Sequence, residues 1–301
     1  MGGPARIAAF AALLLGVFAG AALLGGAIDP PGSVAEEDRG AEVSRQRPTG
    51  GDHGSMNGDS TDADGGKAPA PTLPGLQVAQ DGYRLVVDRA RLASGERQAR
   101  FGFRIIDRRG APVREFEVAH EKRMHFVVVR RDLTSFQHLH PTMRPDGTWT
   151  VRVNLASGGV YRGFADFTRD DDQRTLGADV HVGGAYRPEP LPPPQTTART
   201  ENGLVVSLET DGAKAGAAGQ VAFEVRRDGE PVNDRLEPYL GAKGHLVALR
   251  EGDLAYLHTH PEGDELAFVA EYPSAGSYRL FVQFRYDGKV QTAAFTQPVP
   301  R

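Results

Sequence analysis

From Leu76 onward, the chain alternates short hydrophobic runs with clusters of turn residues. The hydrophobic runs are rich in β-branched and aromatic residues, and sequences such as Pro145-Asp146-Gly147 separate them. Short strands at this spacing, with turn signals between them, are typical of a β-sandwich. The runs lie at residues 82–87, 97–107, 123–129, 136–140, 148–154 and 160–167.

The same order of features occurs twice. "GAPV" at residues 110–113 returns as "GEPV" at 229–232, and "SGGVYRGFADF" at 157–167 returns as "SAGSYRLFVQF" at 274–284. A proline-rich stretch at residues 185–198 lies between the copies and is typical of a stiff linker. The sequence therefore predicts an all-β protein with two tandem Ig-like or cupredoxin-like β-sandwich domains, at residues 76–184 and 199–299.

The N-terminal residues predict export. Residues 7–28 contain no charged residue, Arg6 precedes them, and Asp29 and Glu36 follow. This pattern predicts a transmembrane helix within residues 1–28, with the rest of the chain on the extracytoplasmic side. The alternative is a cleaved signal peptide, since residues 25–27 are small, and the domains would then be secreted. Residues 29–75 are rich in Gly, Asp, Ser and Pro, which predicts a disordered linker.

Composition removes several classes of function. The chain has no cysteine, which excludes disulfides, thiolate nucleophiles, iron–sulfur clusters and a blue-copper electron-transfer centre. The net charge is −4, so the chain lacks the excess of basic residues that nucleic-acid-binding proteins have, and no nucleic-acid partner is expected.

Six of the nine histidines follow one repeated pattern. His125, His138 and His140 of "MHFVVVRRDLTSFQHLHP" return as His245, His258 and His260 of "GHLVALREGDLAYLHTHP". Only six of these eighteen aligned positions are identical, and three of the six are histidine. Packing alone seldom requires histidine, so the pattern suggests that these histidines have a functional role.

A hairpin would bring each set together. With a loop at residues 131–134, His125 lies opposite His140 and Val127 lies opposite His138. Directly opposed residues share one face of a sheet, about 5 Å apart. A loop at residues 251–254 places His245 opposite His260 in the same way.

Three converging imidazoles indicate a metal site, because imidazole is a preferred ligand of zinc and copper. The competing interpretation is a purely structural histidine network. His120 is a further candidate ligand, with no counterpart at Leu240. Candidates for completing the sites are Glu121 and Met143 in the first copy, and Glu262, Asp264 and Glu265 in the second.

The stretches "AHEKRMHFVVVRRDLTSFQHLHP" and "YRLFVQF" resemble bacterial, largely actinobacterial, exported and membrane-anchored proteins with cupredoxin-like and YtkA-like β-sandwich domains. The resemblance implies copper or heavy-metal handling by the six repeated histidines. Because cysteine is absent, storage or delivery of the metal is expected rather than electron transfer.

The sequence thus predicts a membrane-tethered metal-binding protein acting as a copper chaperone, buffer or sensor, with zinc as the alternative ion. Its expected partners are the metal, the membrane and a partner membrane protein. An enzyme is not expected. The alternatives are a structural or adhesive exoprotein, and a three-histidine zinc or cupin-like enzyme, since Gly252, His258, His260 and Glu265 approach a cupin spacing.

Overall fold

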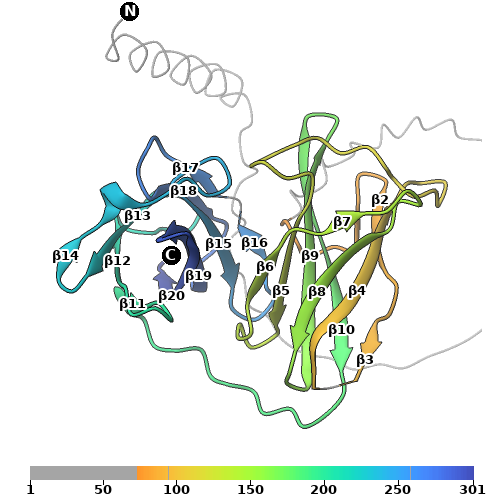
Figure 1. Ribbon diagram of the computed structural model, residues 1–301, viewed down its shortest axis with the longest axis horizontal. Helices are drawn as coiled ribbons and strands as arrows, with labels where there is room; N and C mark the ends of the chain where they lie inside the picture. Colours follow the sequence, from red (N-terminus) through yellow and green to blue (C-terminus); the bar gives the residue numbers. More distant parts are fainter. Residues whose placement is uncertain (1–72, 94, 258) are drawn as a thin grey trace, which may run out of the picture. The chain divides into compact units, whose positions relative to one another are not determined.

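The computed structural model describes residues 73–93, 95–257 and 259–301 (Figure 1). These residues belong to one compact unit, residues 67–301. The predicted anchor at residues 1–28 and nearly all of the predicted linker lie outside the described residues. No membrane-spanning helix is found in the part of the chain that the structure describes.

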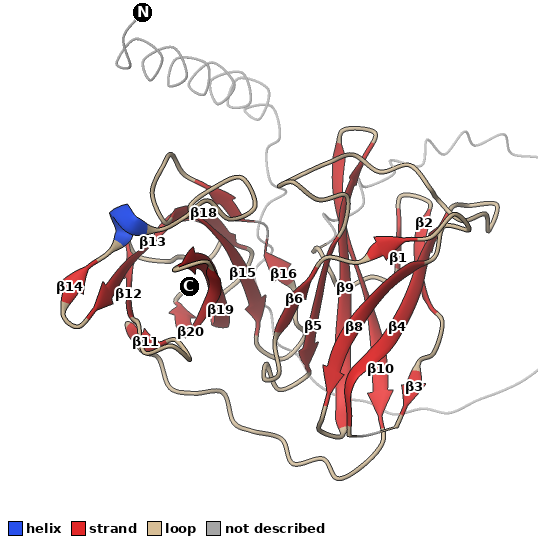
Figure 2. Ribbon diagram, viewed as in Figure 1, coloured by secondary structure: helices blue, strands red, loops and turns tan. Residues whose placement is uncertain are grey.

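The first repeat consists of two five-stranded sheets (Figure 2). Turn residues separate their strands, as expected for a sandwich. In sheet order, the first contains β1 (Ala79–Gln80), β2 (Tyr83–Val87), β4 (Glu96–Ile106), β8 (Trp149–Leu155) and β7 (Thr142–Met143). The second contains β3 (Arg91–Leu92), β10 (Asp172–Val182), β9 (Gly159–Arg169), β5 (His125–Arg130) and β6 (Gln137–Leu139).

The second repeat again has two sheets, which confirms the predicted internal repeat and the β-sandwich fold. One contains β11 (Thr197–Arg199), β12 (Val205–Thr210), β13 (Ala217–Arg227), β18 (Ala267–Tyr272) and β17 (Thr259–Pro261), with β14 (Glu230–Pro231) paired to β13. The other contains β16 (Tyr256–Leu257), β15 (Gly244–Arg250), β19 (Gly276–Tyr286) and β20 (Lys289–Val299). A single 3₁₀ turn, η1 (Asn233–Arg235), is the only helix among the described residues.

Residues that the two copies share have matching structural roles. The hydroxyl of Tyr161 donates to the carbonyl of Ser157 at 3.0 Å, and the hydroxyl of Tyr278 donates to the carbonyl of Ser274 at 2.8 Å. Each bond fixes the entry of a long central strand, in the manner of a tyrosine corner. Burial of these phenol rings, both at most 1% exposed, anchors each sandwich core.

A third apolar core lies between the repeats. β5 and β9 contribute Val127, Val129 and Phe164 to it, and β15 and β19 contribute the equivalent residues Val247, Leu249 and Phe281, all at most 4% exposed. Phe136 stacks on Phe281 with ring centroids 4.0 Å apart. β5 is buried along its entire length because one of its faces belongs to the first sandwich and the other to this interface.

The predicted register of the first hairpin is confirmed. Val127 lies opposite His138 and Val128 opposite Gln137. The turn is held by Arg130, only 4% exposed, which forms an ion pair with Asp132 at 2.7 Å.

In the second repeat, Ala248 lies opposite Leu257, as the predicted register requires. The expected pairing of His245 with His260 is wrong, however. Beyond Leu257 the chain leaves this sheet and enters β17, where the backbone of His260 pairs with Val269 of the opposite sheet. The hydroxyl of Thr259 donates to the carbonyl of Leu246 at 2.7 Å, which fixes the chain at this crossing.

Candidate metal centre

Four histidine rings from both repeats lie together, and we call them the histidine cluster: His125, His138, His140 and His245. His125 begins β5, His138 is the middle residue of β6, and His140 follows β6 directly. His245 comes from β15 of the second repeat. The rings of His138 and His140 lie 5.1–5.3 Å from that of His125, and the His245 ring stacks on His125 at 5.5 Å with an interplanar angle of 6°.

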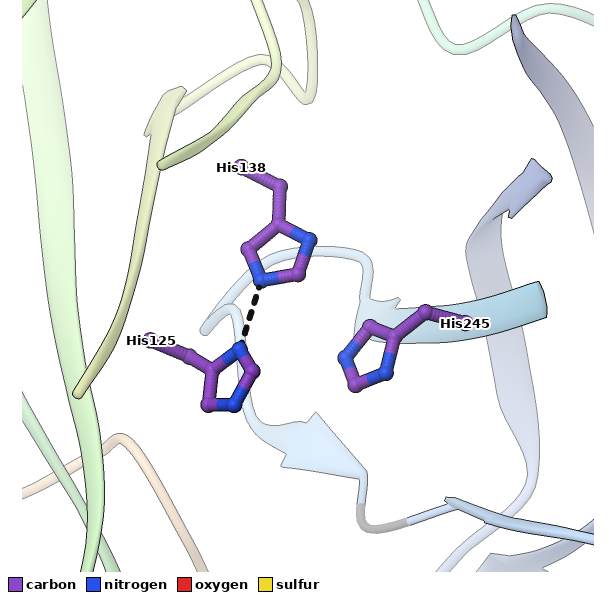
Figure 3. Close-up of side chains that lie close together, drawn as sticks. All are labelled: His125, His138 and His245. Carbon is purple, nitrogen blue, oxygen red and sulfur yellow. Dashed lines mark hydrogen bonds between the residues drawn. The ribbon is translucent and has the colours of Figure 1, made fainter. Parts of the chain in front are cut away.

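Three members of the cluster present ring nitrogens to one another (Figure 3). One nitrogen each of His125, His138 and His245 lies within 4.8 Å of the other two. Imidazole nitrogens that bind one tetrahedral zinc ion at 2.0–2.1 Å lie about 3.3 Å apart. His125 Nδ1 and His138 Nε2 are already 3.1 Å apart, so His245 would need to move by only about 1–2 Å.

Hydrogen bonds to oxygen determine which nitrogen of each ring carries its proton. His125 Nε2 lies 3.1 Å from the carbonyl oxygen of Ala119, and His138 Nδ1 lies 2.8 Å from Oε1 of Gln283. With the Gln283 amide oriented so that Oε1 faces His138, both oxygens accept and each of these ring nitrogens is the N–H donor. In the neutral rings, His125 Nδ1 and His138 Nε2 therefore both carry lone pairs.

Two lone pairs facing each other at 3.1 Å repel unless a cation lies between or beside them. A proton could fill that role, but burial, together with repulsion from His125 and His140, lowers the pKa of His138 to about 3. A metal ion bound by both nitrogens would remove this repulsion. An N–H to carbonyl bond on the far side of the ring is the usual outer contact of a metal-bound histidine.

The other rings are also held neutral. Burial lowers the pKa of His140 to about 4, with contributions from His125 and Lys122, and lowers the pKa of His245 well below 6.5. Burial lowers the pKa of His125 as well. Neutral imidazole is the form that binds metals, so the cluster needs to release no protons at pH 7.

His140 and His120 surround this triad. Nε2 of His140 is buried and has no hydrogen-bond partner among the described residues, a state that costs roughly 1–3 kcal/mol. His120 lies 5.7 Å from His245 and 6.1 Å from His125, between ring centroids. Its φ of 48° and that of Glu121, 63°, form a two-residue turn closed by two bonds between Ala119 and Lys122.

The remaining candidates lie elsewhere or are not described. His258 and the side chain of His260 are outside the described residues, so the predicted cluster of the second repeat stays untested. His245 instead lies in the cluster of the first repeat. Met143 packs against the first sandwich core, and Glu262 accepts a hydrogen bond from Gln220 at 2.7 Å. Asp264 and Glu265 line a separate pocket of the second repeat.

Sequence reasoning missed Gln283, the partner of His138. Its counterpart in the first repeat is Asp166, so a comparison of the copies gives no identity at this position. The signal that could have identified it is its spacing: Gln283 lies two residues after Phe281 on the same strand, so the two side chains share one face of the sheet.

One family model matches both halves of the chain. It is the domain of unknown function DUF8832, and it covers residues 77–184 and 198–301. The chain belongs to this family. The two DUF8832 repeats correspond to the two sandwiches, while the relation to cupredoxin-like and YtkA-like modules stays a prediction. No curated protein matches the sequence.

Solved structures with tandem β-sandwich domains are distantly similar. The Escherichia coli adhesin FdeC is 12% identical, with 73% of this chain and 64% of that chain covered and a TM-score of 0.24. InvD of Yersinia pseudotuberculosis is 12% identical, with 72% and 57% covered and a TM-score of 0.25. A two-domain fibronectin type III segment of chicken tenascin is 9% identical, with 73% and 100% covered and a TM-score of 0.22. This chain thus spans less than two thirds of the FdeC and InvD chains, and similarity at this level carries no argument about function.

Proposed function

We propose that this protein binds one transition-metal ion at a site shared by its two DUF8832 repeats, with His125, His138 and His245 as ligands. The observation that carries the proposal is the pair of lone-pair nitrogens of His125 and His138, 3.1 Å apart, each fixed by an N–H bond on the far side of its ring. This arrangement is unfavourable without a cation and suited to one.

The biological role that we propose is a copper chaperone, buffer or sensor, held at the outer face of a membrane by the N-terminal segment. Three neutral nitrogen ligands suit copper and zinc alike. Copper is preferred because of the sequence resemblance to exported copper-associated proteins, and zinc is the alternative. A partner membrane protein would deliver or receive the ion.

We propose binding rather than catalysis. A hydrolytic metal centre needs a general base within hydrogen-bond reach of its bound water. Two described carboxylates lie near the cluster. Glu121 is an exposed turn residue, and Asp166, which lies opposite His125 on β9, accepts hydrogen bonds from Gln173 and Thr175. Neither forms a hydrogen bond with a cluster histidine among the described residues. No acid–base pair is therefore assembled there by the described side chains.

The test is metal affinity in the full-length chain, measured by competition against a chelator of known affinity. His138→Ala and His245→Ala should each weaken copper and zinc binding by at least ~100-fold, although the two residues belong to different repeats. His181→Ala is the matched control, because His181 is exposed on β10, outside the cluster. The metal affinity of this variant should stay at the wild-type value. Equal affinities in all four proteins would overturn the proposal.

The competing function is a structural or adhesive exoprotein in which the histidines only join the repeats. The bond from His138 to Gln283 favours it, because it crosses the interface. With the Gln283 amide reversed, His138 would donate to His125 and no ion would be required. This reading predicts that His138→Ala lowers the stability of the protein while copper and zinc fail to bind the wild type.

A further inference from the structure

A pocket of ≈350 Å³ opens beside the histidine cluster, and we call it the cluster pocket. His138 and His140 form part of its wall together with Gln283, so the pocket adjoins two members of the histidine cluster. The volume is at the lower end of small-molecule sites. The pocket is lined by Glu121, Lys122, His138, His140, Tyr239, Leu240, Gln283, Arg285 and Val290.

Two cationic side chains enter this pocket from different repeats. Arg285 follows Gln283 on the same face of β19, since alternate residues of a strand share a face. Lys122 comes from the turn that also carries His120. Neither Lys122 nor Arg285 forms an ion pair with a carboxylate among the described residues. The guanidinium of Arg285 instead lies 5.9 Å from the ring centre of Tyr239.

The charges of the pocket favour an anion once a metal is bound. Lys122 and Arg285 contribute two positive charges and Glu121 one negative charge, while the cluster histidines are neutral. A divalent ion adds two more positive charges, and neutral nitrogen ligands do not compensate them. A concave site with uncompensated positive charge concentrates anions, and the planar guanidinium of arginine matches a carboxylate or a phosphate with two parallel N–H donors.

We infer that the cluster pocket binds a small oxyanion, a carboxylate or a phosphate, as an additional ligand of the ion held by the histidine cluster. This inference rests on the proposed metal site and specifies what completes it. Lys122 and Arg285 would then recognise the anion.

The experiment uses the full-length chain loaded with Cu(II), whose ligand-field absorption changes when the copper gains a ligand. Acetate and phosphate are titrated separately, which distinguishes the two sources of oxyanion, and imidazole is titrated as an uncharged ligand. Lys122→Met and Arg285→Met should each raise the half-saturating concentration of the preferred anion by about tenfold. The half-saturating concentration of imidazole should stay the same, because imidazole binds copper in its neutral form.

Arg199→Met is the charge-matched control, since Arg199 is exposed on β11 and does not line the pocket. It should leave the anion titrations at their wild-type values. The inference is overturned, with the metal site intact, if imidazole changes the spectrum while neither anion does, or if the Lys122 and Arg285 variants bind the anion as the wild type does. A chain that takes up neither copper nor zinc overturns both the inference and the proposed function.

Discussion

Gln283 provides the sharpest test of how the cluster is prepared for a metal. This side chain is only 7% exposed, accepts the Nδ1–H of His138 at 2.8 Å and donates to Thr292 Oγ1 at 3.1 Å. Gln283→Leu removes the acceptor while keeping most of the volume. His138 is then free to move its proton to Nε2, the nitrogen that faces His125, and this form cannot bind a metal there. Gln283→Glu keeps an acceptor and adds a negative charge, which fixes the proton on Nδ1.

The expected magnitude follows from the role of such outer contacts. Loss of the partner of a ligating histidine weakens metal binding by about 10–100-fold, or ~1.4–2.8 kcal/mol. Gln283→Leu should show a loss of this size. Gln283→Glu should bind the ion at least as tightly as the wild type, because the carboxylate is the stronger acceptor and increases the basicity of the ring.

Competition titrations with zinc and with copper at pH 7 measure the effect, and circular dichroism verifies that each variant is folded. Thr292→Val is the matched control, since it removes the other hydrogen bond of Gln283 and leaves the acceptor for His138 in place. Its metal affinity should change by less than about threefold. The reasoning is refuted if Gln283→Leu binds as tightly as the wild type, or if Gln283→Glu loses as much affinity as Gln283→Leu.

Three further predictions concern stability. The metal-free protein should lose stability as the pH falls below about 6.5, by up to ~1.4 kcal/mol per pH unit from His138 alone. The cause is that His138 has a pKa of about 3 in the folded protein, so below pH 6.5 the unfolded chain binds a proton that the folded protein does not. Urea unfolding from pH 7 to 4 measures this slope, and His138→Gln should make it shallower. Phe281→Ala should cost about 3–4 kcal/mol in the same assay, since the ring is 4% exposed and stacks on Phe136, and a cost below ~1 kcal/mol would contradict the packed interface. Glu121→Gly should raise the melting temperature, because glycine adopts the positive φ of 63° without strain, as Gly241 does in the second repeat; an unchanged or lower value would contradict the turn assignment.

The strands and the first hairpin could be predicted from sequence because they depend on local patterns. β-branched runs between turn residues indicate strands, and an even loop length fixes which residues share a face. That parity placed Val127 opposite His138, as observed. The same argument failed for His260, because nothing in "HTHP" distinguishes a continuing strand from one that crosses to the opposite sheet.

The position of His245 beside His125 could not be predicted from the hairpins, since it depends on how the two repeats pack. A signal for this packing was present. β5 reads "HFVVVR", with apolar residues on both faces, and such a strand is covered on both sides. The pattern indicates that the outward face carrying Val127 is buried by another element, but it does not identify that element as the equivalent face of the second repeat.

The number of ions bound per chain tests the shared site most directly. Native mass spectrometry of the full-length protein, loaded with zinc or copper and freed of excess metal, gives this number. The account predicts one ion in the wild type, one in His181→Ala, and none in either His138→Ala or His245→Ala. Two ions in the wild type, with one retained in each single variant, would show that each repeat binds its own ion and would contradict a site built from both.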